Sequence, residues 1–276
     1  MTKNDIVFWG PKTTRGGVFT GLLQTRPAES ERLRRNVMRS RGILELRLEK
    51  LAQKGRKKLL VSEENILGSM RTNLRMRALY PGLDERLLRF SEVFGARCTR
   101  IGLAVRPYED YWASSLAYSL RSGQNWLDRR AIETLVEQPR SWCNVVQDVT
   151  RAFPNAEVVV WEFAHLIGRP HDQFRALNGF GRLRLSPDAS RSNAAPTRND
   201  LREILIQRGD MDGLRALAVG EGKFMPFLPA QIASLRARYQ QDLDWLRRAN
   251  DKRLKFIGEN QAGLVEPGPN EGWRYA

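Results

Sequence analysis

The chain has 276 residues, of which 41% are hydrophobic and 28% are charged, and these values exclude a largely disordered protein. No apolar run approaches the roughly eighteen residues of a membrane span, and the polar start Met1–Asp5 lacks the features of an export signal. The two cysteines, Cys98 and Cys143, exclude a disulfide framework and a structural zinc site, so we expect them in the core. Because His165 and His171 are the only histidines, we expect no metal centre, and we expect a soluble, cytoplasmic protein.

Positive charge is the strongest feature of the composition. Forty-six Lys and Arg stand against thirty-one Asp and Glu, which gives a net charge of +15 and an isoelectric point near 10.4. Such a surface attracts nucleic acid, phosphorylated cofactors, acidic glycans or anionic lipid. The positive residues occur along the whole chain, so the charge predicts an anionic partner without choosing among these classes.

The first part of the chain alternates short apolar runs with stretches of helix length. Four runs predict buried strands: Ile6–Trp9, Leu59–Ser62, Ile101–Val105 and Val158–Phe163. The stretches between and around them predict helices: Glu29–Lys54, Leu83–Phe94, Tyr108–Arg121 and Arg130–Ala152. This alternation is typical of an α/β fold, in which helices cover both faces of a central parallel sheet in three layers.

The remainder predicts a loop, two helices and a tail. Residues 186–197 are rich in Ser, Pro, Asn and Ala and indicate a surface loop. Apolar residues at helical spacing indicate helices over Arg198–Arg208 and Pro229–Arg253. We therefore expect a single domain over residues 1–257 and a flexible tail over residues 258–276.

Polar segments follow the first three predicted strands. They are residues 10–17, residues 62–65 and the pair Arg106-Pro107. In an open parallel sheet, ligands collect at the carboxyl ends of the strands, so we expect these three segments on one rim.

Arg106 has the most specific context in these segments. The residue before a proline is extended and Pro107 suits the first turn of a helix, so Arg106 should end its strand at the sheet edge. Ser114 follows eight residues later, and an arginine fork with a hydroxyl donor can hold a phosphate. In the alternative interpretation, Arg106 pairs with Glu109 or Asp110, and Ser114 is a small packing residue.

The segment around Arg106 resembles the 3′-phosphate-binding segment of sulfotransferases, which use 3′-phosphoadenosine-5′-phosphosulfate (PAPS). Residues 105–118 read Val-Arg-Pro-Tyr-Glu-Asp-Tyr-Trp-Ala-Ser-Ser-Leu-Ala-Tyr. Residues 60–65, 79–81 and 139–163 also look like the bacterial members of that family. The resemblance covers roughly residues 58–179, and it implies a P-loop-like α/β fold.

The resemblance also implies roles for individual residues. Arg106 and Ser114 would bind the 3′-phosphate of PAPS. Glu63 or Glu64 would be the base that takes the proton from an acceptor hydroxyl or amine during sulfuryl transfer. One of the two glutamates would instead form a structural ion pair, and His165 is a further candidate for the base. The acceptor would be an acidic molecule or a glycan.

The first polar segment departs from the family pattern. Sulfotransferases hold the 5′-phosphosulfate with a loop of the type Gly-x-x-Lys-[Ser/Thr]-Gly-[Ser/Thr]-[Ser/Thr]. Residues 10–17 read Gly-Pro-Lys-Thr-Thr-Arg-Gly-Gly, so Lys12, Thr13 and Thr14 are present but the glycines are displaced. Either these residues form a degenerate loop, or the loop lies upstream of Met1; we favour the second alternative.

Two rival functions remain. The chain could be a non-catalytic sulfotransferase relative that keeps the 3′-phosphate site, or a basic nucleic-acid-binding protein. The sequence holds no recognisable helix-turn-helix or RNA-binding motif, and Arg106 lies at a strand end, so we do not expect nucleic acid as the partner.

Overall fold

The computed structural model describes residues 6–24, 30–177, 196–217, 220 and 222–258. Five strands occur in these residues: β1 (Ile6–Trp9), β2 (Lys58–Val61), β3 (Arg100–Val105), β4 (Glu157–Glu162) and β5 (Leu254–Ile257). The four strands expected from the sequence are confirmed to within one residue, whereas β5 was not predicted. The predicted tail lies outside the described residues from residue 259 on.

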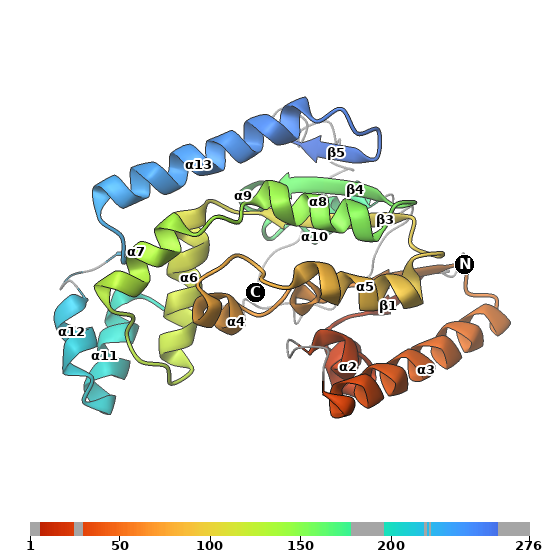
Figure 1. Cartoon of the computed structure of the whole chain (residues 1–276), viewed down its shortest axis with the longest axis horizontal. Helices are drawn as coiled ribbons and strands as arrows, with labels where there is room; N and C mark the ends of the chain where they lie inside the picture. The colour runs from red at the N-terminus through yellow and green to blue at the C-terminus, as the bar shows by residue number, and fades with distance from the viewer. Residues whose placement is uncertain (1–5, 25–29, 178–195, 218–219, 221, 259–276) are drawn as a thin grey trace, which may run out of the picture.

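All strand pairs within the described residues are parallel, but they form two sheets. β1 pairs with β2, and β4 lies between β3 and β5 in a three-stranded sheet. Crossover helices connect the strands, and α8 and α13 run along the three-stranded sheet (Figure 1). The α/β class is therefore confirmed, whereas the expected single central sheet is replaced by two small hydrogen-bonded ladders.

Helices make up most of the described chain. The longer ones are α3 (Glu31–Gln53), α5 (Leu83–Phe94), α6 (Tyr108–Arg121), α7 (Arg129–Glu137), α8 (Trp142–Ala152), α11 (Arg198–Arg208) and α13 (Pro229–Arg248). The short ones are α1 (Pro11–Thr13), α2 (Thr20–Leu23), α4 (Met70–Met76), α9 (Phe163–Leu166), α10 (Pro170–Ala176) and α12 (Met211–Ala216). None of these helices has both the length and the apolarity needed to cross a bilayer.

Two predicted helices differ from the structure. The stretch predicted as one helix over Arg130–Ala152 is two, because the chain is extended at Gln138 before Pro139 and α8 restarts with a capping box at Ser141. The last predicted helix ends at Arg248 rather than Arg253, and the five residues that follow lead into β5.

A buried carboxylate connects three helices in the core. The thiol of Cys143 donates to Asp242 Oδ1 at 2.9 Å, and the amide of Trp142 donates to Asp242 Oδ2 at 3.1 Å. The hydroxyl of Tyr108 donates to the same carboxylate. Burial and the neighbouring Asp242 raise the pKa of Cys143 to about 12, so the thiol stays protonated. Cys143 is therefore half-buried and has a structural role as a hydrogen-bond donor, whereas the sequence predicted a core residue.

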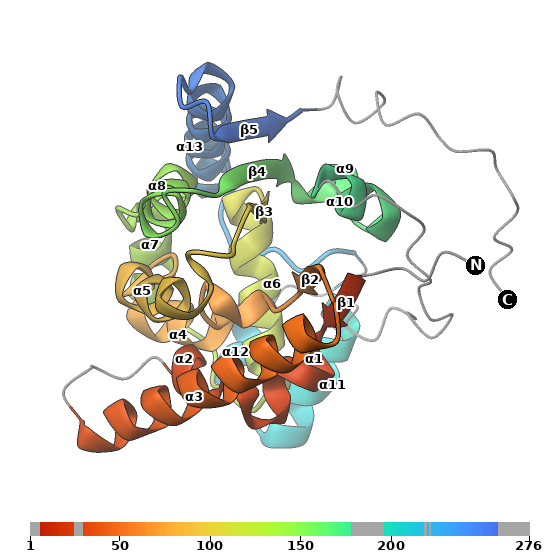
Figure 2. The ribbon, with the colours of Figure 1, turned by 90° about the vertical axis from the view of Figure 1, so that its right-hand side faces the viewer.

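The helix α3 crosses α2 at very short range (Figure 2). A Cβ atom on Gly21 would lie 2.2 Å from the carbonyl oxygen of Asn36, so only glycine fits at this crossing. The amide of Gly21 donates to Ser40 Oγ at 2.9 Å, and this hydrogen bond is buried. The contact fixes α3 against the segment that follows β1.

Candidate functional site

The candidate site begins where β1 and β2 end side by side. Trp9 is paired with Val61, and the amide of Ser62 donates to the carbonyl of Trp9 at 2.9 Å. Gly10 then caps α1, and the chain turns back through a kink at Gly16 and Gly17, where Gly17 has a φ of +96°. The parallel pairing therefore brings residues 10–15 and 62–65 together, as expected for two polar segments on one rim.

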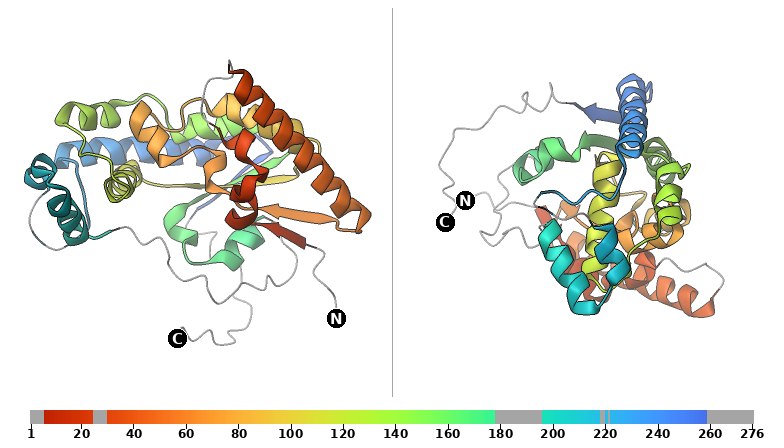
Figure 3. Two further views of the ribbon diagram at one scale, coloured as in Figure 1. Left: turned by 90° about the horizontal axis from the view of Figure 1, so that it is seen from below. Right: turned by 90° about the vertical axis from the view of Figure 1, so that its left-hand side faces the viewer.

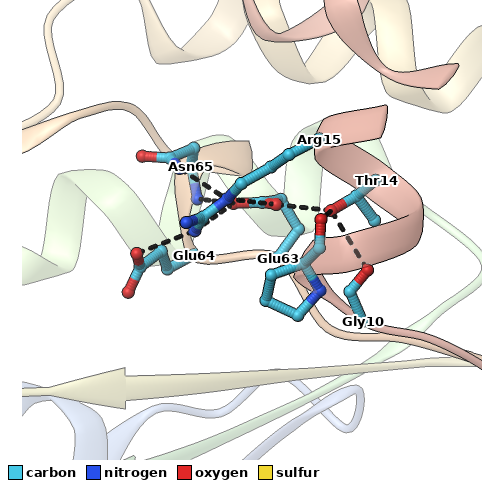
Figure 4. A network of polar contacts seen from close by, with 7 residues as sticks. Gly10, Thr14, Arg15, Glu63, Glu64 and Asn65 are labelled. Atoms are coloured by element: carbon cyan, nitrogen blue, oxygen red, sulfur yellow. Dashed lines mark hydrogen bonds and ion pairs between the residues drawn. The ribbon is translucent and has the colours of Figure 1, made fainter. Parts of the chain in front are cut away.

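Glu63 is the centre of a polar network at this point (Figure 4). Its side chain is fully buried. Oε2 accepts from Thr14 Oγ1 at 2.5 Å and from Arg15 Nε at 3.1 Å, while Oε1 accepts from Arg15 Nη2 at 3.0 Å. Oε1 also accepts from the amide and from Nδ2 of Asn65, both at 2.9 Å. Both carboxylate oxygens are thus fully engaged.

The pKa of Glu63 reflects two opposing effects. Burial raises it, but the hydrogen bonds from Arg15, Thr14 and Asn65 and the charge of Arg15 together lower it below the ordinary value. The side chain is therefore an ionised carboxylate. The hydrogen bonds and charges of Glu63 and Glu64 in turn raise the pKa of Arg15.

Glu64 points to solvent beside this network. Its side chain is 70% exposed and accepts one hydrogen bond from Arg15 Nη2, at 2.8 Å. Arg15 therefore bridges the two glutamates that were predicted as alternative bases. Arg15 was not predicted as a site residue, because local sequence does not show that Arg15 reaches residues 48 and 49 positions away.

The three loop candidates have different environments. Thr14 is buried and faces Glu63, whereas Lys12 is exposed and Thr13 is half-buried. Within the described residues, neither Lys12 nor Thr13 contacts Glu63 or Glu64 through a hydrogen bond or ion pair. Lys12 and Thr13 thus remain accessible to a ligand, whereas the hydroxyl of Thr14 already donates to Glu63.

Arg106 directly follows β3, at the carboxyl end of the strand, as predicted. Its carbonyl accepts a hydrogen bond from Trp142 Nε1 at 2.8 Å, and its guanidinium lies over the ring of Phe163, 5.2 Å from the centroid. Burial lowers the pKa of Arg106. Within the described residues no ion pair engages Arg106, because Glu109 pairs with Arg236 and Asp110 pairs with Lys223. The first of these ion pairs joins Glu109 Oε1 and Arg236 Nε at 2.8 Å.

Ser114 lies on α6 two turns after Arg106. It is half-buried, and its hydroxyl has no hydrogen bond to any described residue. Its neighbour Ser115 is fully buried and donates to the carbonyl of Tyr111 at 2.8 Å. Ser115 is therefore part of the packed core, whereas the hydroxyl of Ser114 is available to bind a ligand.

A pair of tyrosines connects the two halves of the site. The rings of Tyr80 and Tyr111 lie 5.9 Å apart, and Tyr111 accepts from Asn73 Nδ2 at 2.5 Å. Burial raises the pKa of both hydroxyls; the charge of Glu64 adds to this effect at Tyr80, and that of Arg106 opposes it at Tyr111. The charge of Glu64 therefore acts on one member of the pair and that of Arg106 on the other. Tyr80 also has a φ of +48°, which is rare outside glycine.

His165 follows β4, but it is engaged in a structural contact. Its Nδ1 lies 3.8 Å from Glu162 Oε1, and Glu162 also accepts from the hydroxyl of Tyr239 at 3.2 Å. No group of three acidic, histidine or cysteine side chains suited to a metal occurs in the described part of the chain.

Comparison with known proteins gives no relative. No protein-family model, curated protein or solved structure matches the chain. The function must therefore be inferred from the site itself.

Proposed function

We propose that the chain is a P-loop-like sulfotransferase that passes a sulfuryl group from PAPS to a hydroxyl or amine acceptor. The observation that carries the proposal is Arg106, a half-buried cation without an ion pair in the described residues, at the carboxyl end of a parallel strand. Anionic ligands bind at such strand ends. The resemblance of residues 105–118 to the 3′-phosphate segment supports the same assignment.

In this proposal Arg106 and Ser114 hold the 3′-phosphate. The guanidinium has lost part of its hydration, and the charge of Asp110 compensates this loss only in part, so a phosphate would supply further negative charge. The free hydroxyl of Ser114 would add a donor. Tyr80 and Tyr111 would form the wall between this phosphate and the glutamates.

Lys12 and Thr13 are the candidates for the 5′-phosphosulfate. Residues 10–17 directly follow β1 and form α1 and the kinked turn after it, at the edge where Glu63 lies. This position supports the degenerate-loop alternative over a loop upstream of Met1. Lys12 would contribute positive charge to the sulfuryl group as negative charge develops on the leaving phosphate.

The base has to become available before it can act. Glu63 has no free lone pair while Arg15 and Thr14 donate to it, so we propose that the anionic donor draws Arg15 away. Glu63 would then be a buried carboxylate with a raised pKa. The acceptor oxygen attacks sulfur, the bond from sulfur to the phosphate oxygen breaks, the acceptor proton passes to Glu63, and 3′-phosphoadenosine-5′-phosphate leaves. Glu64 is the exposed alternative.

Binding of 3′-phosphoadenosine-5′-phosphate, measured by calorimetry, tests the nucleotide site. Arg106→Ala should weaken binding about ten- to hundred-fold, because a hydrogen bond to a charged group contributes roughly 1.5–3 kcal/mol. Arg121→Ala is the matched control, since Arg121 ends α6, the helix that follows Arg106, and lies over the ring of the exposed Tyr118. Equal affinities of the two variants would exclude the assignment.

Transfer of labelled sulfate from PAPS tests the chemistry. Glu63→Gln should lower the transfer rate and leave nucleotide affinity nearly unchanged. An unchanged rate would move the base to Glu64 or His165. Tight nucleotide binding without transfer would favour the non-catalytic relative, an alternative that the fully engaged carboxylate of Glu63 supports.

A further inference from the structure

More than half of the excess positive charge lies in α3 and the turn after it. Residues 31–58 contain eleven Lys and Arg and three Glu, which is a net charge of +8 out of +15 for the whole chain. All eleven cationic residues are exposed. The net charge of the whole chain does not show that its positive charge is concentrated in this segment.

Six of these cations lie along one side of α3. At about 100° per residue, their positions fall within about one third of the helix circumference. We call them the basic stripe: Arg32, Arg35, Arg39, Arg47, Lys50 and Lys54. The three acidic residues fall outside this arc: Glu31, Glu45 and Glu49.

The charge of the basic stripe is not neutralised from within the described part of the chain. None of the six cations has a hydrogen bond or ion pair from its side chain to a described residue. By contrast, Arg41 lies outside the stripe and pairs with Glu45 at 3.2 Å and with Glu92 at 3.1 Å. The carboxylates near α3 thus form ion pairs on a different side of the helix from the basic stripe.

The helix that carries the basic stripe is a rigid platform. The adjoining side of the helix is buried through Leu33, Ser40 and Leu44, and the Gly21 crossing holds it against α2. It lies at the edge of the molecule, at the other end from α11 and α12 (Figure 3). The stripe is therefore open to a large ligand.

We propose that the basic stripe binds the phosphate backbone of a nucleic-acid duplex. The stripe is about 33 Å long at 1.5 Å per residue, which is close to one turn of duplex, about 34 Å. A duplex carries one charge per roughly 1.7 Å of axis, and cations that contact it release condensed counterions. Arginine forks suit phosphate oxygens. The binding is independent of base sequence and separate from the proposed transferase site.

A linear polyanion fits the basic stripe better than a membrane does. A flat anionic bilayer in contact with the stripe would also approach Glu31 and Glu49, which lie just outside the arc. Membrane helices also present a continuous apolar face, whereas the large exposed apolar side chains on α3 are only Met38 and Leu46 among the described residues.

Fluorescence anisotropy of the full chain with a labelled 20-base-pair duplex tests the proposal. If all six cations contact phosphates, affinity should fall about a thousand-fold between about 50 and 200 mM salt. The triple variant Arg35→Glu, Arg39→Glu, Lys50→Glu should bind at least about ten-fold more weakly and lower the slope of log affinity against log salt by about 3.

A matched control separates the stripe from net charge. The triple variant Arg97→Glu, Arg130→Glu, Lys252→Glu changes the charge by the same amount at exposed sites elsewhere, and it should bind within about three-fold of the parent. Equal losses in both variants would overturn the proposal, as would stripe-dependent binding to phosphatidylserine vesicles with weak duplex binding. If the glutamate variant does not fold, the corresponding glutamine variant should show the same order of affinities.

Discussion

Arg15 and Glu63 connect the segments that follow two parallel strands through hydrogen bonds of 3.1 Å from Nε to Oε2 and 3.0 Å from Nη2 to Oε1, with a longer one of 3.4 Å from Nε to Oε1. The partners differ in exposure: the side chain of Arg15 is 46% exposed, whereas that of Glu63 is completely buried. A buried carboxylate depends on its donors far more than an exposed guanidinium depends on its acceptor. The pair therefore contributes to stability mainly through Glu63.

Glu63→Gln should destabilise the fold by about 1–3 kcal/mol, because the variant loses charge-assisted hydrogen bonds and turns an amide group toward donors. Glu64→Gln is the matched control and should cost less than about 1 kcal/mol, since Glu64 forms one exposed ion pair. Urea unfolding of both variants measures the difference. Equal free energies of unfolding would show that the network around Glu63 does not stabilise the protein.

The lowered pKa of Glu63 predicts a loss of stability in acid. In the unfolded chain the carboxyl takes up a proton near its ordinary pKa of 4.5, whereas in the folded protein it stays ionised to lower pH. The stabilisation by Glu63 is thus complete above pH 4.5 and is lost as the pH falls through the lower, folded value. Melting curves between about pH 3 and 7 should show a smaller acid loss for Glu63→Gln than for the parent. Identical pH profiles would contradict the assignment.

The strands and the position of Arg106 were predictable because they depend on local sequence. Buried parallel strands are short apolar runs, and a proline after Arg106 fixes the strand end. β5 was missed because Leu254–Ile257 contains a lysine and directly follows a long helical pattern. It becomes a strand only by pairing with β4.

The partners of Glu63 could not be predicted for a different reason. Arg15 and Glu63 lie 48 positions apart, and they meet because β1 and β2 pair in parallel register. The sequence placed both residues at strand ends but gave no information on which side chain would be buried. The separation of the strands into two ladders likewise depends on tertiary packing.

Asp242 should be one of the most sensitive positions of the core. Asp242→Ala would leave the Tyr108 hydroxyl and the Cys143 thiol without their acceptor and the Trp142 amide with only the Tyr108 oxygen, and we expect a loss of about 3 kcal/mol or more. Asp244→Ala, on the same helix but 40% exposed in its side chain, should cost less than about 1 kcal/mol. Thermal unfolding measures the difference between the two variants. Similar melting temperatures would show that the hydrogen bonds to Asp242 do not stabilise the core.

Ser114 and Ser115 offer a test of the nucleotide site between adjacent residues. Ser114 has no hydrogen bond to a described residue, so Ser114→Ala should leave the melting temperature unchanged and weaken binding of 3′-phosphoadenosine-5′-phosphate about ten-fold or more, because one hydrogen bond to a charged phosphate contributes roughly 1.5–3 kcal/mol. Ser115→Ala should do the opposite: it removes the buried hydrogen bond to Tyr111 and lowers stability, with little effect on affinity. Calorimetric titration and thermal unfolding of both variants give the two readouts. If Ser114→Ala binds the nucleotide as tightly as the parent, then Ser114 does not contact the 3′-phosphate, and Arg106 would have to hold it with other donors.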